Sequence, residues 1–317
     1  MALNHIRVSL LVPCFNAENY IQDFIENISQ QIRSFDEVIF YDDASTDGTP
    51  KLLEQQNLGR VISGKINLGP SVGRNILLHA SRGQLVHFHD IDDLLEPSFL
   101  ACTLEALTEE VDVVITNMRV LDRDTGQTLY IHDYSELNQS ENSTEFFLTH
   151  CCYAINGLYR KKELEKIGGF RESLSRDEDP DLHIRLAFAG ARICSLPLPL
   201  AINRVGAGTY SSTSYVECWR EHLKALRCYS HELPTKYRSV LCKDSARMVS
   251  LCAGGDLDLA YQYLEFCTSL GGQADLWQAT STPIKLLARL IGYRNALRLR
   301  FGRLGKTLRN LWPWRIG

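Results

Sequence analysis

From Ile6 to Thr116, short apolar runs alternate with segments whose apolar residues recur at helical spacing. Such runs are typical of buried strands, and Thr-Pro or Pro at the start of the other segments is typical of a helix start. We expect strands at five runs: Ile6 to Pro13, Glu37 to Tyr41, Arg60 to Ile62, Leu85 to His89 and Val111 to Thr116. Asn16 is expected to cap the first helix, whose apolar positions extend to Ile32. Because strands that alternate with helices form a mostly parallel sheet flanked by helices, the sequence predicts an α/β fold.

The alternation ends after Asn117. We expect four elements there: a hairpin turn from Asp122 to Gln127, a polar loop from Ser135 to Thr144, a helix from Asp179 to Ala189 that Gly190 stops, and an extended segment from Ile193 to Leu200. From Tyr215 onward the pattern is helical, without comparable strands. We therefore expect one α/β domain over residues 1–212, with halves at 1–117 and 118–212, and a helical C-terminal region over residues 213–317.

The composition is that of an ordinary globular protein, with 44% hydrophobic and 23% charged residues. The ten cysteines are scattered without C-x-x-C or Cys/His spacing, so we interpret them as buried thiols of a reduced compartment. No stretch approaches the roughly 18 consecutive apolar residues of a membrane span, and Met1 to Pro13 lacks the pattern of a signal peptide. We expect a cytoplasmic location, either free or peripheral on the inner face of the cell membrane.

Charge is distributed unevenly along the chain. Residues 284–317 hold nine of the 34 basic residues and none of the 38 acidic residues. Apolar residues, including two Trp, are interleaved with these basic residues as in an amphipathic helix. Such a tail either packs on the acidic body of the protein or lies on an anionic membrane surface, where basic and tryptophan residues are favoured. A nucleic-acid partner is not expected, because no nucleic-acid-binding motif accompanies the basic run.

Polar residues follow three of the predicted strands at the point where each strand ends. The three strand ends are Pro13-Cys14-Phe15-Asn16, then Asp42-Asp43 with the turn Ala44 to Thr49, then His89-Asp90-Ile91-Asp92-Asp93. In open α/β sheets, ligands bind beyond the carboxyl ends of the strands, so one crevice should collect these carboxylates. Ser45, Asp47 and Thr49 are equally well explained as turn and cap residues, but a turn does not require a second acid beside Asp42.

The triplet Asp90, Asp92 and Asp93 predicts a site for a divalent metal ion. Two like charges about 4 Å apart repel by roughly 4 kcal/mol at an effective dielectric of about 20, and a divalent cation removes that penalty. Hard oxygen ligands suit Mg²⁺ or Mn²⁺, which complete their shells with water and phosphate oxygens. The alternative is a solvated acidic turn before the helix at Pro97, with Asp93 as a cap.

A diphosphate ligand also needs a cationic group, and the segment from Asn67 to Asn75 supplies one. Gly69 permits a tight turn, and Gly73 allows a backbone to approach closely. Arg74 offers a planar fork to phosphate or to an acidic group. The segment is not a P-loop, because it lacks the G-K-[ST] ending.

A second acidic cluster extends from Asp177 to Arg185. Asp179 is either a catalytic residue or the N-cap of a helix that starts at Pro180. Asp181 and Arg185 have the spacing of an i,i+4 surface pair. Spacing alone leaves both the catalytic and the structural interpretation open.

Taken together, these motifs resemble those of the family 2 glycosyltransferases of GT-A fold over about residues 6 to 210. The matching segments are Val12 to Asn16, Tyr41 to Thr49, Asn67-Leu68-Gly69 with Gly73-Arg74-Asn75, Asp90 to Asp93, Gly168-Gly169-Phe170 and Glu178-Asp179. Each motif alone is weak, but six in this order are specific. The resemblance implies a Rossmann-like nucleotide-binding half followed by an acceptor half.

The resemblance further implies an inverting enzyme that moves a sugar from a nucleotide-sugar, with UDP-sugars favoured, to a hydroxyl acceptor. The acceptor would be a glycan or lipid-linked molecule in cell-surface polysaccharide, glycolipid or glycoprotein glycan synthesis. Asp179 would be the general base, Asp43 would bind the nucleobase, and Asp92 and Asp93 would hold Mn²⁺ or Mg²⁺ on the diphosphate. Two groups of residues would contact the substrates: Pro13, Phe15, Asn16, Asn67, Gly69, Arg74, Asp90 and Asp92 at the donor, and Glu178, Arg185 and Arg204 at or behind the acceptor.

The sequence departs from the family pattern at three places. Gly73 stands where Ala is usual, and Pro180 directly follows the expected base. The stretch Asn203 to Gly206 lies where many members have Tyr-Arg-x-His, so a histidine often found near the diphosphate is missing.

Two other functions compete with this interpretation. A non-catalytic relative that binds nucleotide-sugar or glycan, or that serves as a scaffold at a membrane, would explain the missing histidine, whereas the intact acidic residues favour an enzyme. A sugar-nucleotide pyrophosphorylase would have a Gly-rich basic loop after the first strand, where this chain has Asn16-Ala17-Glu18-Asn19.

Overall fold

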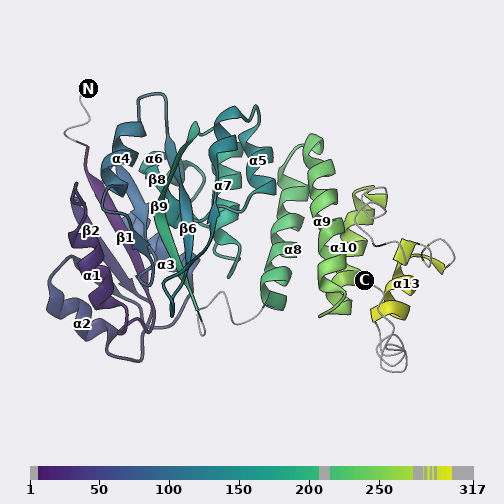
Figure 1. Ribbon diagram of the computed structural model, residues 1–317, viewed down its shortest axis with the longest axis horizontal. Coiled ribbons are helices and arrows are strands. Elements are labelled where there is room, and N and C mark those ends of the chain that lie inside the picture. The colour runs from purple at the N-terminus through teal and green to yellow at the C-terminus, as the bar shows by residue number, and fades with distance from the viewer. Residues whose placement is uncertain are drawn as a thin grey trace. The chain divides into compact units, whose positions relative to one another are not determined.

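The computed structural model describes residues 6–206, 215–273, 281, 284, 285, 288 and 291–301. The chain forms two compact units, residues 1–213 and 214–317. Figure 1 shows that the first unit contains the sheet and that the second is helical.

Within the described residues of the first unit, a nine-stranded sheet has the order β3-β2-β1-β4-β8-β6-β9-β5, with β7 paired to β6. Its strands are β1 (Val8–Cys14), β2 (Glu37–Asp42), β3 (Arg60–Ser63), β4 (Leu85–Phe88), β5 (Leu94–Leu95), β6 (Val113–Asp122), β7 (Thr128–His132), β8 (Gly157–Arg160) and β9 (Ile193–Val205). The helices of this unit are α1 (Ile21–Ser29), α2 (Thr49–Gln56), α3 (Pro70–Ala80), α4 (Phe99–Ala106), α5 (Ser143–Thr149), α6 (Lys161–Lys166) and α7 (Glu178–Phe188), with short 3-10 turns η2 (Ser135–Gln139) and η3 (Ala154–Asn156).

The sheet is parallel in its N-terminal half and mixed beyond it. β1, β2, β3 and β4 pair in parallel, and β6 pairs with β9 in parallel. The antiparallel pairs are β4 with β8, β6 with β8, β6 with β7 and β5 with β9. The α/β class predicted from the sequence is confirmed, and the antiparallel pairs enter where the alternation of strand and helix ends.

Helices cover both faces of the parallel strands. Successive residues of a strand point to opposite faces, so a continuous apolar strand has apolar side chains to bury on each face. Leu10 and Val12 of β1 share one core cluster with Ile21 and Phe24 of α1. On the other face α3 packs closely, since a Cβ added at Gly73 would lie 2.9 Å from Cδ1 of Tyr41. This close approach explains why glycine occupies position 73.

Several local predictions are tested directly. The hairpin is confirmed, since the Asp122 N–H donates to the Gln127 carbonyl at 2.9 Å. Gly190, with φ 85°, follows the end of α7 as predicted. The segment predicted as a polar loop from Ser135 instead contains η2 and the start of α5.

Asn16 as the cap of the first helix is wrong. Helix α1 begins only at Ile21 and ends at Ser29, so Ile32 lies outside it and is exposed. Asn16 has φ 48°, and its Oδ1 accepts a hydrogen bond from the Thr46 N–H at 2.9 Å. The left-handed backbone turns this side chain toward the next loop instead of toward the helix.

The second unit consists of helices over the residues that are described. They are α8 (Tyr215–Glu232), η5 (Thr235–Tyr237), α9 (Arg238–Cys252), α10 (Leu257–Ser269) and α13 (Tyr293–Phe301). Ala296 and Leu297 of α13 are buried, and Arg294 Nη1 lies 3.5 Å from Glu265 Oε1 of α10. The beginning of the basic tail therefore packs within this unit, while residues 302–317 and parts of 282–290 lie outside the described residues.

Two further sequence expectations concern thiols and membrane spans. All ten cysteines are free thiols, and five of them are buried. Among the helices of the described residues, none combines the length and the apolar character that a membrane crossing requires.

Gly169→Ala should lower stability more than Gly168→Ala. Both residues have positive φ, 77° at Gly168 and 70° at Gly169, and a side chain in that region costs about 1–2 kcal/mol. A Cβ at Gly168 meets open space, whereas a Cβ at Gly169 lies 2.3 Å from Asn75 Oδ1. Urea unfolding should show a loss of about 1 kcal/mol for Gly168→Ala and more than about 2 kcal/mol for Gly169→Ala. Equal losses would show that the turn moves away from Asn75 without penalty.

Candidate functional site

The buried guanidinium of Arg74 joins two acidic segments that are far apart in the sequence. Arg74 lies on α3, and its side chain is 5% exposed. Its Nη2 donates to Asp90 Oδ1 at 2.7 Å, and its Nη1 donates to Glu178 Oε1 at 2.8 Å. Asp179 Oδ1 lies 3.6 Å from the same Nη1. One cation therefore brings the acids that follow β4 next to the first turn of α7.

The carboxylates of Asp90, Glu178 and Asp179 surround the single positive charge of Arg74. This excess of negative charge affects the pKa values of Glu178 and Asp179. Burial and the neighbouring charge of Asp179 raise the pKa of Glu178 to about 7, although Arg74 opposes this. Burial also raises the pKa of Asp179, again against Arg74. The Oδ1 atom of Asp179 accepts no hydrogen bond from the described part of the chain. A carboxylate with a raised pKa and an unbonded oxygen has the properties of a general base.

The N-cap alternative for Asp179 is wrong. Helix α7 begins at Glu178, and Asp177, with φ 62°, occupies the N-cap position. Asp179 therefore lies inside the first turn, together with Pro180, whose missing N–H is tolerated there. A structural role as a cap does not account for the Asp179 carboxylate.

Asp92 and Asp93 have different surroundings although they are adjacent. The Oδ2 atom of Asp92 accepts from Arg123 Nη2 at 2.9 Å, and the side chains of Asp92 and Asp90 are each 34% exposed. Asp93 is 2% exposed, and its carboxylate accepts from Asn203 Nδ2 at 2.9 and 3.1 Å. Asp93 Oδ1 also accepts from the Arg204 N–H at 2.8 Å. The Asp93 carboxylate therefore bonds its loop to β9, whereas the Asp92 carboxylate remains accessible to solvent and ligands.

The carboxylates of Asp90 and Asp92, each 34% exposed and each paired with an arginine, are hard oxygen donors of the kind that a divalent cation takes. Mg²⁺ and Mn²⁺ are commonly held by one or two carboxylates, while water and substrate phosphates complete the shell. Over the part of the chain that is described, no group of three or more His, Cys, Asp or Glu side chains is arranged to hold a metal ion. A cation at Asp90 and Asp92 would therefore need water or phosphate oxygens as further ligands. Asp93 as a direct ligand stays a prediction, with its carboxylate already bonded to β9.

Asp43, at the end of β2, organises the loop before α3. Its two carboxylate oxygens accept from the N–H groups of Leu68 and Gly69 at 2.8 and 2.7 Å. Gly69 has φ 86°, which an L side chain rarely adopts. A cleft of about 270 Å³ lies beside this loop, and its lining residues are Asn67, Leu68, Gly69, Pro70, Ser71, Glu172, Leu174 and Ser175.

The loops that follow β1 and β2 are bonded to each other. The Ser45 hydroxyl accepts from the Asn16 N–H at 2.9 Å, and the Thr49 hydroxyl accepts from the Ala17 N–H at 2.7 Å. Ser45 and Thr49 therefore have the turn roles that the sequence left open. Phe15, in contrast, is 49% exposed at the end of β1 and is available to a ligand.

Two of the predicted arginines act within the protein. Arg185 is not half of a surface pair, since its partner Asp181 is fully buried and their Nε–Oδ2 distance is 2.7 Å. Its Nη2 donates to the Gly169 carbonyl at 2.7 Å, so it holds the turn that follows α6. Arg204 donates from Nε to the Asp92 carbonyl at 2.6 Å and from Nη1 to Asp23 at 2.9 Å.

Arg123 and Tyr20 belong to the site, although the sequence motifs do not include them. Arg123 donates to the Tyr20 hydroxyl at 2.8 Å, and its guanidinium carbon lies 4.7 Å from the centre of that ring. Arg123 directly follows β6, at the carboxyl end of a strand that runs parallel to β9. Its position at the start of the predicted hairpin is the signal that could have identified it.

The sequence profile described as "Glycosyl transferase family 2" matches residues 9–168. The chain belongs to this family. EpsH of Bacillus subtilis (strain 168), provisionally named a glycosyltransferase, is 29% identical over 210 residues, which are 62% of this chain and 60% of EpsH. Chondroitin synthase of Escherichia coli is 27% identical over 232 residues, which are 69% of this chain and 32% of that protein. The match thus spans only 32% to 60% of the length of these two curated relatives.

Solved structures of similar fold extend over nearly the whole chain. S. aureus TarS 1-349 in complex with UDP-GlcNAc matches with a TM-score of 0.67 at 20% identity, over 98% of this chain and 93% of that chain. The mannosyltransferase PcManGT from Pyrobaculum calidifontis, in complex with GDP-Man and Mn²⁺, matches with a TM-score of 0.58 at 18% identity, over 98% of this chain and 88% of that chain. The GT-A type fold expected of this family 2 member is confirmed.

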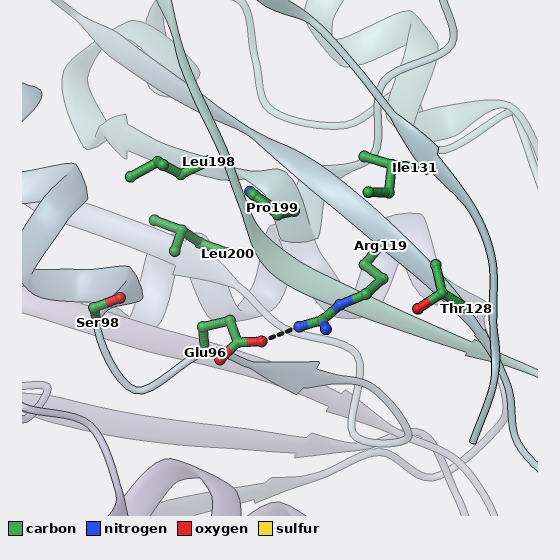
Figure 2. Close-up of a pocket in the computed structure, with 8 residues that line it drawn as sticks. All are labelled: Glu96, Ser98, Arg119, Thr128, Ile131, Leu198, Pro199 and Leu200. Carbon is green, nitrogen blue, oxygen red and sulfur yellow. Dashed lines mark hydrogen bonds and ion pairs between the residues drawn. The ribbon is translucent and has the colours of Figure 1, made fainter.

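A second hollow, of about 400 Å³, shares no lining residue with the acidic site. Figure 2 shows Leu198, Pro199 and Leu200 along one wall and Ile131 across from them. Arg119 and Glu96 form an ion pair with each other there. The hollow therefore offers mostly apolar surface, and the acidic chemistry of this glycosyltransferase family member lies elsewhere.

Glu178→Gln should change how stability depends on pH. The pKa of Glu178 is about 7 in the folded protein, above its ordinary value of 4.5, so the folded state holds this proton more tightly than the unfolded state. The resulting stabilisation is present below pH 4.5 and is lost as the pH rises through 7. Because Gln does not titrate, the unfolding free energy of the variant relative to wild type should rise over this range, by on the order of 1–3 kcal/mol. Urea unfolding at several pH values measures this; a constant difference would show that Glu178 is ionised throughout.

Proposed function

We propose that this chain is an inverting glycosyltransferase that moves a sugar from a nucleotide-sugar to a hydroxyl acceptor. The observation that carries the proposal is the placement of Asp90, Glu178 and Asp179 around the guanidinium of Arg74. It brings the acids at the nucleotide-binding edge of the sheet beside a carboxylate that is suited to accept a proton. Solved structures of similar fold contain UDP-GlcNAc, UDP or GDP-Man, which supports a nucleotide-sugar donor, and we favour a UDP-sugar.

Asp179 is the general base of this proposal. Inversion in one displacement requires a group that removes the acceptor's hydroxyl proton while its oxygen attacks the sugar on the face opposite the leaving group. We propose that the Asp179 carboxylate receives that proton; its Oδ1 accepts no hydrogen bond within the described residues and lies 3.6 Å from Arg74 Nη1, which supports this role. No covalent intermediate on the protein is required.

Asp92, with Asp90 beside it, is the group that we propose for contact with Mn²⁺ or Mg²⁺. Such a cation, when bound, stabilises the negative charge that develops on the departing nucleoside diphosphate. Asp93 would support this contact from behind, because it ties the chain after Asp92 to β9. The Mn²⁺ in the PcManGT complex agrees with a cation in this fold.

The nucleoside would bind at the edge formed by β1 and β2. Asp43 holds the loop Leu68-Gly69, and the cleft beside this loop includes Asn67. Pro13, Phe15 and Asn16 border the same edge at the end of β1, where the exposed ring of Phe15 offers a surface for a base or a ribose.

The acceptor is proposed to be a glycan or a lipid-linked molecule in cell-surface polysaccharide synthesis. Relatives named for teichuronic acid biosynthesis and for chondroitin synthesis support this class of acceptor. Such a reaction would take place in the cytoplasm, at the inner face of the cell membrane.

Asp179→Asn tests the proposed function. Turnover should fall by about 10²- to 10⁴-fold, because Asn cannot accept the proton, while affinity for UDP with Mn²⁺ should stay within about twofold. Sugar transfer or slow hydrolysis of a panel of UDP-, GDP- and dTDP-sugars gives the rate, and calorimetry gives the affinity. Glu163→Gln, on α6, is a control for loss of an acidic side chain. Unchanged turnover in Asp179→Asn would contradict the assigned base, and nucleotide binding without turnover in wild type would favour a non-catalytic relative.

We also propose that the end of the basic tail contacts an anionic membrane surface. Residues 293–301 pack within the helical unit, so the proposal rests on residues 302–317, whose sequence includes Arg303, Lys306, Arg309, Trp312 and Trp314. Basic residues near anionic lipid contribute on the order of 1 kcal/mol each, and tryptophan is favoured at the headgroup level.

Removal of residues 302–317 should release the protein from vesicles that contain phosphatidylglycerol. Binding of the full chain should weaken as salt rises, because salt screens exposed charges. Vesicle sedimentation at low and high salt measures both effects, with neutral phosphatidylcholine vesicles as the control. Equal sedimentation of the full and shortened chains would overturn the membrane proposal, and a melting temperature lowered by the truncation would show that these residues stabilise the fold.

A further inference from the structure

The carboxylate of Asp92 is already paired with a cation of the protein itself. Arg123 Nη2 donates to Asp92 Oδ2 at 2.9 Å, and the Arg123 side chain is 20% exposed. The guanidinium lies over the Tyr20 ring, donates to its hydroxyl, and reaches the Arg204 carbonyl at 3.3 Å. Its Nε is buried and has no hydrogen-bond partner among the described residues. Arg123 is therefore held over Asp92 by its contacts with Tyr20 and with the Arg204 carbonyl.

Gly206 provides the space that Arg123 occupies. A Cβ added at Gly206 would lie 3.3 Å from the Cβ of Arg123, which is tighter than ordinary contact. A side chain at position 206 would therefore require a shift of a few tenths of an ångström at Arg123. The glycine that ends the stretch after Asn203 thus lies in close contact with the base of the Arg123 side chain.

The other contacts of this segment do not depend on the Asp92 carboxylate. Arg204 holds the backbone carbonyl of Asp92, and Asp93 is bonded to Asn203 and to the backbone of Arg204. The loop therefore keeps its position when Arg123 moves. The Arg123–Asp92 pair is the contact at this site that a ligand can exchange without unfolding the loop.

We infer that Arg123 couples cation binding to diphosphate binding by exchanging Asp92 for a phosphate oxygen of the donor. A divalent cation that binds Asp92 must displace or repel Arg123, so the cation alone binds weakly. A diphosphate supplies new hydrogen-bond acceptors for Arg123, whose planar guanidinium matches the geometry of phosphate oxygens. Its negative charge also attracts both the divalent cation and the Arg123 guanidinium. Cation and diphosphate therefore favour each other's binding, and the coupling is reciprocal. This inference rests on the proposed cation contact of Asp92.

Arg123→Met should shift two affinities in opposite directions. Met keeps the packing on Tyr20 but removes the charge, so Mn²⁺ alone should bind more tightly than in wild type. UDP in the presence of saturating Mn²⁺ should bind more weakly, because the fork is gone. The coupling factor between Mn²⁺ and UDP should fall by about fivefold or more, the lower end of typical coupling between sites. Calorimetry with UDP and paramagnetic resonance of free Mn²⁺ measure these affinities without any turnover.

Three further variants make the result decisive. Arg119→Met removes an arginine of β6 that pairs with Glu96 outside the acidic site, and it should leave all affinities unchanged. Tyr20→Phe keeps the ring and removes the hydroxyl, so it should shift both affinities as Arg123→Met does but less, and it serves if that variant does not fold.

Asp92→Ala separates the inference from the function: if Mn²⁺·UDP binds wild type and Asp92→Ala alike, the proposed cation contact and this inference are both wrong. If binding depends on Asp92 but Arg123→Met changes both affinities in the same direction or neither, only the inference is wrong.

Discussion

The geometry of the site depends on the ion pairs of one buried guanidinium. The planar fork of Arg74 points Nη2 at Asp90 and Nη1 at Glu178, so one side chain fixes two directions at once. A lysine, with a single charged nitrogen on a flexible stem, would not fix both. Removal of one partner from a buried ion pair commonly costs about 3–5 kcal/mol, because the remaining charge is left uncompensated. Arg74 therefore sets how the acids after β4 lie relative to the first turn of α7.

Neutral contacts from the same helix reinforce this arrangement. Asn75 donates to the Phe170 carbonyl at 2.9 Å and accepts from the Phe170 N–H at 2.8 Å, and Ser71 donates to the Leu174 carbonyl at 2.8 Å. The Phe170 ring in turn lies 5.3 Å from the Arg74 guanidinium. Helix α3, from the nucleotide-binding half, thus builds part of the other half of the site. The position of the proposed donor site relative to the proposed base would then follow from one helix.

The sequence predicts which strand ends meet, because the carboxyl ends of parallel strands lie at one edge whatever their side chains do. It does not predict how neighbouring acids divide their roles. Asp92 and Asp93 differ because Asn203, which lies 110 residues after Asp93, and the Arg204 N–H bond to Asp93, whereas Arg123 bonds to Asp92. Arg185 has the spacing of a surface residue, yet tertiary packing places its partner in the core. Contacts between distant segments carry no short-range signal, so these roles emerge only from the folded chain.

The bonds between the loops after β1 and β2 have a consequence for the kinetics of nucleotide capture. Asn16 bonds to Ser45 and Thr46, and the Glu18 carboxylate accepts from the Gly48 N–H at 2.7 Å. A nucleotide at this edge, as proposed, would meet backbone that these bonds already order, so little conformational entropy would be lost in forming the complex. The proposed association would then need no slow closure of these loops, and differences in affinity between nucleotides would arise mainly from how quickly each one dissociates.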